Sequence, residues 1–493
     1  MEEFFNSLTN IVATANKYLS DYVLIVLLVG IGLFYTISTK FVQVRCFGEG
    51  MKNVFGGIKT VGKKEKRGMS SFQAVATAIA AQVGTGNIVG ACGAILLGGP
   101  GAIFWMWVIA FLGMATNYAE AVLAQKTRET SKDGEILGGP VYYMKKAFPN
   151  WFGKALGIFF AIATVIALGF IGTMVQSNSI SEAVQNVFVG VDPLIIQIAV
   201  AVVLAVVAGF IFIGGVKRLA SVTEKLVPVM AILYILGGIV ILCANITNVL
   251  PAFGLIFKHA FLPEAFAGGA IGTAISQGAK RGLFSNEAGM GSTPHAHAQA
   301  NVKYAHQQGT AAIASVFIDT FVVLTFTALI VISSLYAGGV ITDSNPVGLD
   351  KSNLVANAFK VTFGGSNAAL TVGSIFVAVC LLFFAFSTII SWNLFGKINF
   401  QYLFGKKATI VYSIISIGFI VLGAFMKNDL VWELTDFFNY LMVLPNVIAL
   451  VALFKMVNKE ISDAQKRKKG EIIDEPDSVI TEESAEEIQE LAE

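Results

Sequence analysis

The sequence predicts an all-α polytopic membrane protein with eleven transmembrane helices, and three observations support this fold class. Of 493 residues, 55% are hydrophobic and only 13% are charged, whereas soluble domains are about 25% charged. Asp, Glu, Lys and Arg are absent from residues 71–117, 227–256 and 361–396, and about 20 apolar residues suffice to cross the hydrocarbon core as a helix. These runs lack the strict alternation of a membrane β-barrel, so the spans are predicted to be helices.

Apolar segments separated by polar loops define the individual spans and the organisation of the chain. The predicted spans are residues 21–43, 70–98, 101–125, 154–187, 194–214, 226–248, 268–290, 309–338, 368–394, 408–426 and 430–455. The predicted units are an N-terminal helix with a basic loop (1–69), a first five-helix repeat (70–250), a second five-helix repeat (268–456) and a cytosolic tail (457–493).

The distribution of Lys and Arg predicts the orientation of these spans. If the N-terminus lies outside, the segments on the cytosolic side hold 27 Lys and Arg residues and the segments outside hold 5. Cytosolic loops of membrane proteins are enriched in these two residues. We therefore expect a multi-pass protein of the cytoplasmic membrane, with its N-terminus outside and its C-terminal tail in the cytoplasm.

The ten spans after the first divide into two sets of five. The second and seventh spans open these sets, and glycine and polar residues interrupt both, at Gln82–Asn87 and at Ser276–Glu287. Because five is odd, the second set is inverted relative to the first. Interrupted segments at matching places in two halves indicate the binding site of a transporter. The prediction is one extra N-terminal helix followed by a 5+5 inverted repeat with two broken helices.

The first interruption contains two glycines in the middle of an uncharged span. Gly84 and Gly86 would free backbone groups from helical hydrogen bonding, which a polar cavity tolerates and a lipid-facing helix does not. N–H groups at the start of the half-helix near Gly86 suit a carboxylate, and carbonyls at the end near Gln82 suit a cation or an ammonium group. A packing glycine pair in an ordinary kinked span is the alternative.

The second interruption places Lys280, Arg281 and Glu287 at membrane depth. Charges there are costly and usually functional. The alternative is that Arg281 and Glu287 pair with each other and lock the helix. Glu120 and Asp319 are single acidic residues within predicted spans, and for both of them structural pairing and a role in coupling stay open.

Three stretches of the chain resemble the alanine/glycine:cation symporters, also called sodium:alanine symporters. The stretches are Gly84–Ile88, Gly138–Met144, and Phe284–Ser292 with Pro294–Ala298. The resemblance covers residues 20–455 and leaves the acidic tail outside. It implies a variant of the leucine-transporter fold with one extra N-terminal helix, which agrees with the separate count of one plus five plus five.

The resemblance also implies which residues bind the transported molecules. The implied substrate pocket consists of Thr85, Gly86, Asn87, Gln176, Phe284 and Trp392. In the implied sodium site, the carbonyls of Ala80 and Val83 join the hydroxyls of Ser387 and Thr388. Lys280 and Arg281 depart from the second broken helix of the wider fold, so no second sodium site is carried over, and no other metal is expected.

These features predict a sodium-coupled symporter, and not an enzyme, that imports a small neutral amino acid such as alanine or glycine by alternating access. The sequence contains no phosphate-binding lysine loop and no nucleophile with an adjacent base. The alternatives are proton coupling, a larger substrate such as glutamine, a channel, and an intramembrane metalloenzyme. The predicted partners are the sodium ion, the amino acid and the lipid bilayer, with no nucleic acid.

Overall fold

The computed structural model describes residues 2–57, 68–131, 134–261, 270–341, 349–426 and 428–471. Nearly all of these residues are helical, as the sequence predicts. Part of the predicted basic loop (58–67) and most of the predicted tail (472–493) lie outside the described residues.

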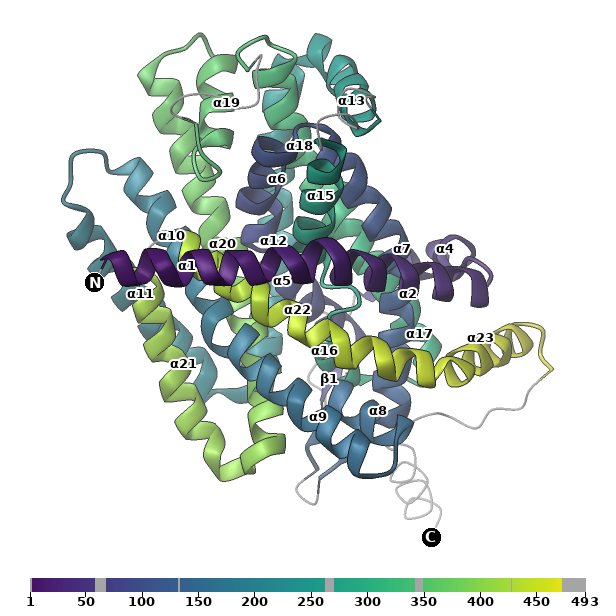
Figure 1. Ribbon diagram of the computed structural model, residues 1–493. Coiled ribbons are helices and arrows are strands. Elements are labelled where there is room, and N and C mark those ends of the chain that lie inside the picture. Colours follow the sequence, from purple (N-terminus) through teal and green to yellow (C-terminus); the bar gives the residue numbers. More distant parts are fainter. Residues whose placement is uncertain are drawn as a thin grey trace.

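The N-terminal segment begins with a long continuous helical stretch, residues 2–38, that crosses the other helices. Figure 1 shows it in purple, running across the front of the molecule. It packs on α22 (Asn428–Ala452), where the Asn16 amide donates to the Glu433 carboxylate at 2.6 Å. The segment consists of α1 (Glu2–Tyr18), the π-helical turn η1 (Leu19–Leu24), α2 (Ile25–Ser38), α3 (Val42–Arg45) and α4 (Phe47–Gly57).

The remaining described residues form two successive groups of helices, interrupted by short π- or 3-10-helical turns and by two-residue strands. The first group consists of β1 (Met69–Ser70), α5 (Ser71–Gln82), η3 (Gly86–Gly90), α6 (Ala91–Gly98), α7 (Gly101–Thr127), β2 (Glu129–Thr130), β3 (Ile136–Leu137), α8 (Pro140–Ala147), α9 (Trp151–Thr164), η4 (Val165–Gly172), α10 (Thr173–Val187), α11 (Pro193–Ile213), α12 (Gly215–Ala244) and α13 (Ile246–Ala260). The second group consists of α15 (Ala270–Asn286), α16 (Pro294–Ala298), β4 (Ala300–Asn301), α17 (Ala305–Val316), η5 (Phe317–Leu324), α18 (Thr325–Val331), η6 (Ile332–Tyr336), α19 (Leu354–Thr362), α20 (Asn367–Phe404), η7 (Lys406–Ala408), α21 (Thr409–Gly423), α22 and α23 (Phe454–Lys468).

Several helices are long and apolar enough to cross a membrane. In the described parts of the chain there are eight of them, and the bent pair of α5 with η3 and α6 would make a ninth. Their outer faces carry exposed apolar side chains, such as Val206 on α11 and Ile414 on α21 at 67% and 66% exposure, which suits contact with lipid. The chain is therefore a multi-pass membrane protein.

Two predicted spans fall short of these criteria. The first coincides with α2, which has 14 residues. The seventh coincides with α15, which has 17 residues and carries Lys280 and Arg281. The predicted total of eleven spans therefore stays a prediction.

The first broken helix lies where the glycines predict it. α5 starts with a capping box, in which Ser70 and Gln73 exchange hydrogen bonds between side chain and backbone, and it ends at Gln82. The chain resumes as η3 and α6 after a bend of 45°. Reciprocal capping satisfies two of the N–H groups that a helix start leaves open, so α5 is fixed at one end and broken at the other.

The second broken helix differs from the prediction in where it breaks. The sequence predicts an interruption from Ser276 onward, but α15 continues without a break to Asn286. The helix ends at Glu287, which has a φ of 57°, and Gly289 and Gly291 follow with φ of 86° and 81°. The left-handed region is strained for Glu and ordinary for Gly. The unwound segment is therefore Glu287–Thr293, between α15 and α16.

A short parallel β-bridge joins the residues just before the first broken helix to the residues just after the second. β1 pairs with β4 through Met69 with Ala300 and Ser70 with Asn301. β1 directly precedes α5, and β4 directly follows α16. The start of the first broken helix is thus hydrogen-bonded to the segment that follows the second.

Candidate functional site

The two broken helices meet at their interruptions. The Gln82 amide at the end of α5 donates to the carbonyl of Asn286, the last residue of α15, at 2.8 Å. On the other side of the first break, a β-carbon at position 86 would lie 3.2 Å from the Ser285 Cα. Gly86 suits this close approach, because a β-carbon there would require the neighbouring backbone to shift by a few tenths of an ångström.

Five of the six residues of the predicted substrate pocket lie around this meeting point. The Thr85 N–H donates to the Gln176 side-chain oxygen at 3.3 Å. The Phe284 ring lies close to Gly86, with a ring atom 3.0 Å from the position of a β-carbon there, and it contacts Trp392 edge to face at 5.9 Å between ring centroids. The structure thus brings Thr85, Gly86, Gln176, Phe284 and Trp392 together from four separate segments of the chain.

Two polar atoms of this group are buried without hydrogen bonds. Among the described residues, the Thr85 hydroxyl and the Gln176 amide nitrogen have no partner, and both side chains are fully buried. A buried polar atom without a partner costs about 1–3 kcal/mol. Such atoms next to a helix break are ones that a bound polar molecule would satisfy.

Asn87, the sixth predicted pocket residue, uses both ends of its amide to hold the break. Its oxygen accepts from the Gly84 N–H at 3.1 Å. Its nitrogen donates to the Asp319 carboxylate at 2.7 Å and to the Asp319 carbonyl at 3.1 Å. Asn87 therefore links the first break to η5 in the second group of helices.

Asp319 is a residue of this site that the prediction does not include. Its carboxylate is fully buried and accepts from the Ser285 and Thr320 hydroxyls, each at 2.8 Å, as well as from Asn87. Ser285 belongs to α15, so one carboxylate binds both broken helices. The signal in the sequence is a lone acid in an apolar run, but its partners lie too far away along the chain to be identified.

Three of the four residues of the predicted sodium site, Ala80, Ser387 and Thr388, form a cluster of neutral oxygens. The Thr388 and Ser387 hydroxyls lie 2.9 and 3.3 Å from the Ala80 carbonyl oxygen. Both also lie against the Phe384 carbonyl, at 3.1 and 2.8 Å. Val83, the fourth predicted residue, is buried and directly follows α5 as its C-cap, with its N–H donating to the Ile79 carbonyl. Dehydrated hard cations bind several oxygens at once, and this cluster offers carbonyl and hydroxyl oxygens from two helices.

Glu287 and Arg281 do not pair, so the hypothesis of a locking ion pair between them is wrong. Arg281 instead pairs with Asp436 of α22 at 2.9 Å and lies over the Trp432 ring, 4.9 Å from its centroid. The Glu287 carboxylate accepts from the Trp392 indole N–H and the Ser292 hydroxyl, each at 2.5 Å. Six positions along a helix place two side chains on different faces, and the end of α15 separates these two further.

Glu120 on α7 is a second buried carboxylate that holds a break. It accepts from the backbone N–H groups of Gly289 and Gly291 at 3.1 and 3.0 Å. The Asn446 amide of α22 donates to it at 2.6 Å. Successive backbone N–H groups in a non-helical segment form a concave anion site, and Glu120 fills the one that follows α15.

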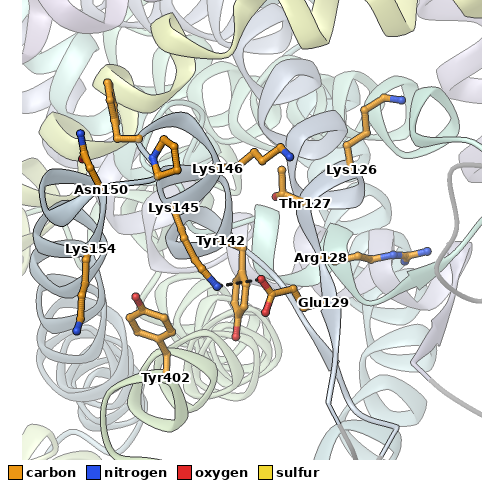
Figure 2. Close-up of a pocket in the computed structure, with 12 residues that line it drawn as sticks. Lys126, Thr127, Arg128, Glu129, Tyr142, Lys145, Lys146, Asn150, Lys154 and Tyr402 are labelled. Carbon is orange, nitrogen blue, oxygen red and sulfur yellow. Dashed lines mark hydrogen bonds and ion pairs between the residues drawn. The ribbon is translucent and has the colours of Figure 1, made fainter.

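A cavity of about 620 Å³ opens elsewhere, between the end of α7 and the turn from α8 to α9. Figure 2 shows its cationic side chains, with Lys145 reaching Glu129 at 3.3 Å. None of the predicted substrate or sodium residues lines it. The cationic residues along its walls are Lys126, Arg128, Lys145, Lys146 and Lys154.

Comparisons with known proteins agree on one family. The model of the sodium:alanine symporter family matches residues 5–477. The sodium/alanine symporter AgcS of Methanococcus maripaludis is 41% identical over 94% of this chain and 98% of its own length. The probable sodium/glutamine symporter GlnT of Bacillus subtilis is 38% identical over 94% of this chain and 92% of its own.

A solved structure supports the fold. The crystal structure of MhsT in complex with L-phenylalanine matches with a TM-score of 0.59 and 16% identity, over 81% of this chain and 93% of that one. The fold is therefore that of the leucine-transporter class, as the resemblance implies. The two-repeat division itself stays a prediction.

Proposed function

Because the chain belongs to the sodium:alanine symporter family, we propose that it is a sodium-coupled symporter that imports a small neutral amino acid by alternating access. The observation that carries this proposal is the meeting of the two helix breaks, beside which lie buried, unpartnered polar atoms and a cluster of neutral oxygens. Such a pair of sites suits a zwitterion and an alkali cation. The drive would come from the sodium gradient, and no bond of the substrate would change.

The substrate would bind at Thr85, Gly86, Asn87, Gln176, Phe284 and Trp392. Its carboxylate would face the N–H groups at the start of η3, where the helix dipole favours negative charge. Its ammonium group would face carbonyls at the end of α5. The Phe284 and Trp392 rings, 5.9 Å apart, would limit the space for its side chain, which favours alanine or glycine.

Sodium would bind to the carbonyls of Ala80 and Val83 and the hydroxyls of Ser387 and Thr388. The two hydroxyls donate to the Ala80 carbonyl in the structure, and rotation about their C–O bonds would turn their lone pairs toward a cation. No acidic side chain belongs to this oxygen set, so the ion would be held weakly enough to be released inside.

A carrier of glutamine is the second candidate, since GlnT is nearly as similar to this chain as AgcS is. Proton coupling is the other alternative. The buried carboxylates of Asp319 and Glu287 at the two breaks are the groups that would carry a proton. Uptake driven by a sodium gradient at constant pH separates the two modes of coupling.

Thr388→Ala tests the proposed sodium site. Interactions with a charged partner are worth about 1.5–3 kcal/mol, so the sodium concentration for half-maximal uptake into proteoliposomes should rise about tenfold or more. The apparent affinity for alanine at saturating sodium should change much less. Thr371→Ala is the matched control, because Thr371 lies exposed on the same helix and its hydroxyl donates to the Asn367 carbonyl one turn earlier. Unchanged sodium dependence in Thr388→Ala would remove this site from the mechanism.

We also propose that the N-terminus lies outside and the C-terminal tail in the cytoplasm, since the cytosolic segments would then hold 27 of the Lys and Arg residues. Asn10→Cys and Glu482→Cys, each in a variant whose exposed Cys243 is replaced by Ser, report the two ends. An impermeant thiol reagent should label position 10 in intact cells and position 482 only after lysis. Labelling of the tail alone in intact cells contradicts this orientation.

A further inference from the structure

Three side chains of metal-ligating types converge at a place that the transport site does not use. They are Cys46, which lies between α3 and α4, Glu49 in the first turn of α4, and His306 in the first turn of α17. Their sulfur, carboxylate oxygen and ring nitrogen all lie within 4.8 Å of one another. No other group of three or more His, Cys, Asp or Glu residues in the described ranges converges in this way.

The His306 ring is held so that one nitrogen faces the other two side chains. Its Nδ1 lies 2.7 Å from the Tyr118 hydroxyl of α7. Its Nε2 lies 3.5 Å from a Glu49 carboxylate oxygen and has no hydrogen-bond partner in the parts of the chain that are described. Histidine ligands of metals typically bond through their second nitrogen to a neighbouring polar group, which fixes the ring. Tyr118 provides this second bond.

The two oxygens of the Glu49 carboxylate also have different neighbours. The oxygen Oε1 faces His306, while Oε2 accepts from the Lys468 ammonium group of α23. Lys468 therefore fixes the carboxylate and leaves Oε1 directed at the cluster. The Cys46 and His306 side chains are buried, and the Glu49 side chain is 27% exposed, so an ion has a path from water.

The helices that carry these residues are packed against each other independently of any ion. The Asn53 amide of α4 donates to the Thr310 hydroxyl of α17 at 2.8 Å. A β-carbon at position 50 would lie 2.2 Å from the Thr310 carbonyl oxygen, so Gly50 permits this close approach. The three ligand atoms are thus brought together by rigid elements, which is what a preformed metal site requires.

We propose that Cys46, Glu49 and His306 form a binding site for a divalent transition-metal ion of the zinc class. A thiolate, an imidazole and a carboxylate are the ligands that zinc accepts, with a water molecule in the fourth position. The thiolate disfavours Mg²⁺ and Ca²⁺, which prefer oxygen ligands only. Three protein ligands and one water give an exchangeable site, suited to a regulatory ion.

A bound ion would tie α4 to the start of α17. The same helix continues into η5. Asp319 of η5 accepts hydrogen bonds from Asn87 in the first break and from Ser285 near the end of α15. An ion that binds one arrangement of α4 and α17 better than others shifts the protein toward that arrangement. Zinc should therefore slow uptake, an effect that rests on the proposed transport function, whereas binding itself does not.

Cobalt binding to the purified full-length protein tests the site directly. Co²⁺ replaces zinc in such sites and gives an absorption band when a thiolate is a ligand. The wild type and Cys243→Ser, which changes the exposed cysteine, should bind one Co²⁺ with this band and release it to Zn²⁺. Cys46→Ser should lose the band, and His306→Gln and Tyr118→Phe should weaken binding about tenfold or more. Equal bands in Cys46→Ser and the wild type, or no band in either, overturn the proposal.

Uptake measurements separate binding from regulation. Zinc should inhibit alanine uptake by the wild type and by Cys243→Ser, and it should leave uptake by Cys46→Ser unaffected. Metal binding through Cys46 without any effect on uptake overturns the regulatory role alone. If neither the wild type nor any variant shows sodium-driven uptake, even without zinc, the proposed function is contradicted. The metal site is unaffected by that result.

Discussion

Asp319→Asn should reduce sodium-driven uptake about a hundredfold or more while the protein still folds. The Asp319 carboxylate accepts from Asn87, Ser285 and Thr320. An amide in its place offers one acceptor oxygen, and its NH₂ group would face another donor. Each lost hydrogen bond to a charged group costs about 1.5–3 kcal/mol, and 1.4 kcal/mol is tenfold in an equilibrium constant. The lost hydrogen bonds are those by which Asp319 holds the first break, through Asn87, against Ser285 of α15.

Uptake by the purified variant in proteoliposomes, with size-exclusion profile and thermal unfolding as folding checks, measures this effect. Asp192→Asn is the control, because Asp192 is an exposed residue that caps α11 by accepting from the Leu194 N–H. Asn caps helices as well as Asp does, so this variant should transport normally. Wild-type uptake and sodium dependence in Asp319→Asn would show that the carboxylate has no part in the site.

Glu120→Gln should lower both thermal stability and uptake. Glu120 holds the Gly289 and Gly291 N–H groups and the Asn446 amide. Glutamine keeps one oxygen, so at least one buried donor loses its partner at a cost of about 1–3 kcal/mol. Because this donor belongs to the unwound segment after α15, the segment should become mobile and the substrate site imprecise.

Thermal unfolding and the KM for alanine of Glu120→Gln, compared with Glu129→Gln, measure this prediction. Glu129 is an exposed residue whose carboxylate reaches Lys145 at 3.3 Å, and surface pairs of this kind contribute about 0–1 kcal/mol. The control should therefore match the wild type. If Glu120→Gln unfolds at the wild-type temperature and transports normally, the unwound segment is held by other contacts.

The first break could be predicted from the sequence because its cause is local. Gly84 and Gly86 interrupt an uncharged run, and the backbone breaks there. Ser276–Gly278 shows the same pattern, yet the helix continues. A β-carbon at position 278 would lie 2.8 Å from the Ala102 carbonyl oxygen, so Gly278 serves close packing of α15 on α7. Composition alone does not distinguish a glycine at a break from a glycine at a helix contact.

The partners of the buried charges could not be predicted, because they depend on contacts between distant parts of the chain. Arg281 pairs with Asp436, 155 positions away, and Asp319 binds Asn87, 232 positions away. Burial of a charge in an apolar run indicates only that some partner exists. The resemblance to the family identified Thr85, Gln176 and Trp392 as neighbours, although the first is 91 positions from the second, which no local pattern reveals.

The contacts across the first break also bear on how the protein is made. The polar groups of Gln82, Asn87 and Ala80 find their partners 204, 232 and 308 positions later in the chain. At a synthesis rate of about 5–20 residues per second, these partners leave the ribosome roughly 10–60 s after the break itself. During that interval the first half resides in the bilayer with polar groups that lipid does not satisfy. The nascent half must then be shielded by the insertion machinery, by water or by a temporary pairing, until the second half arrives and completes it.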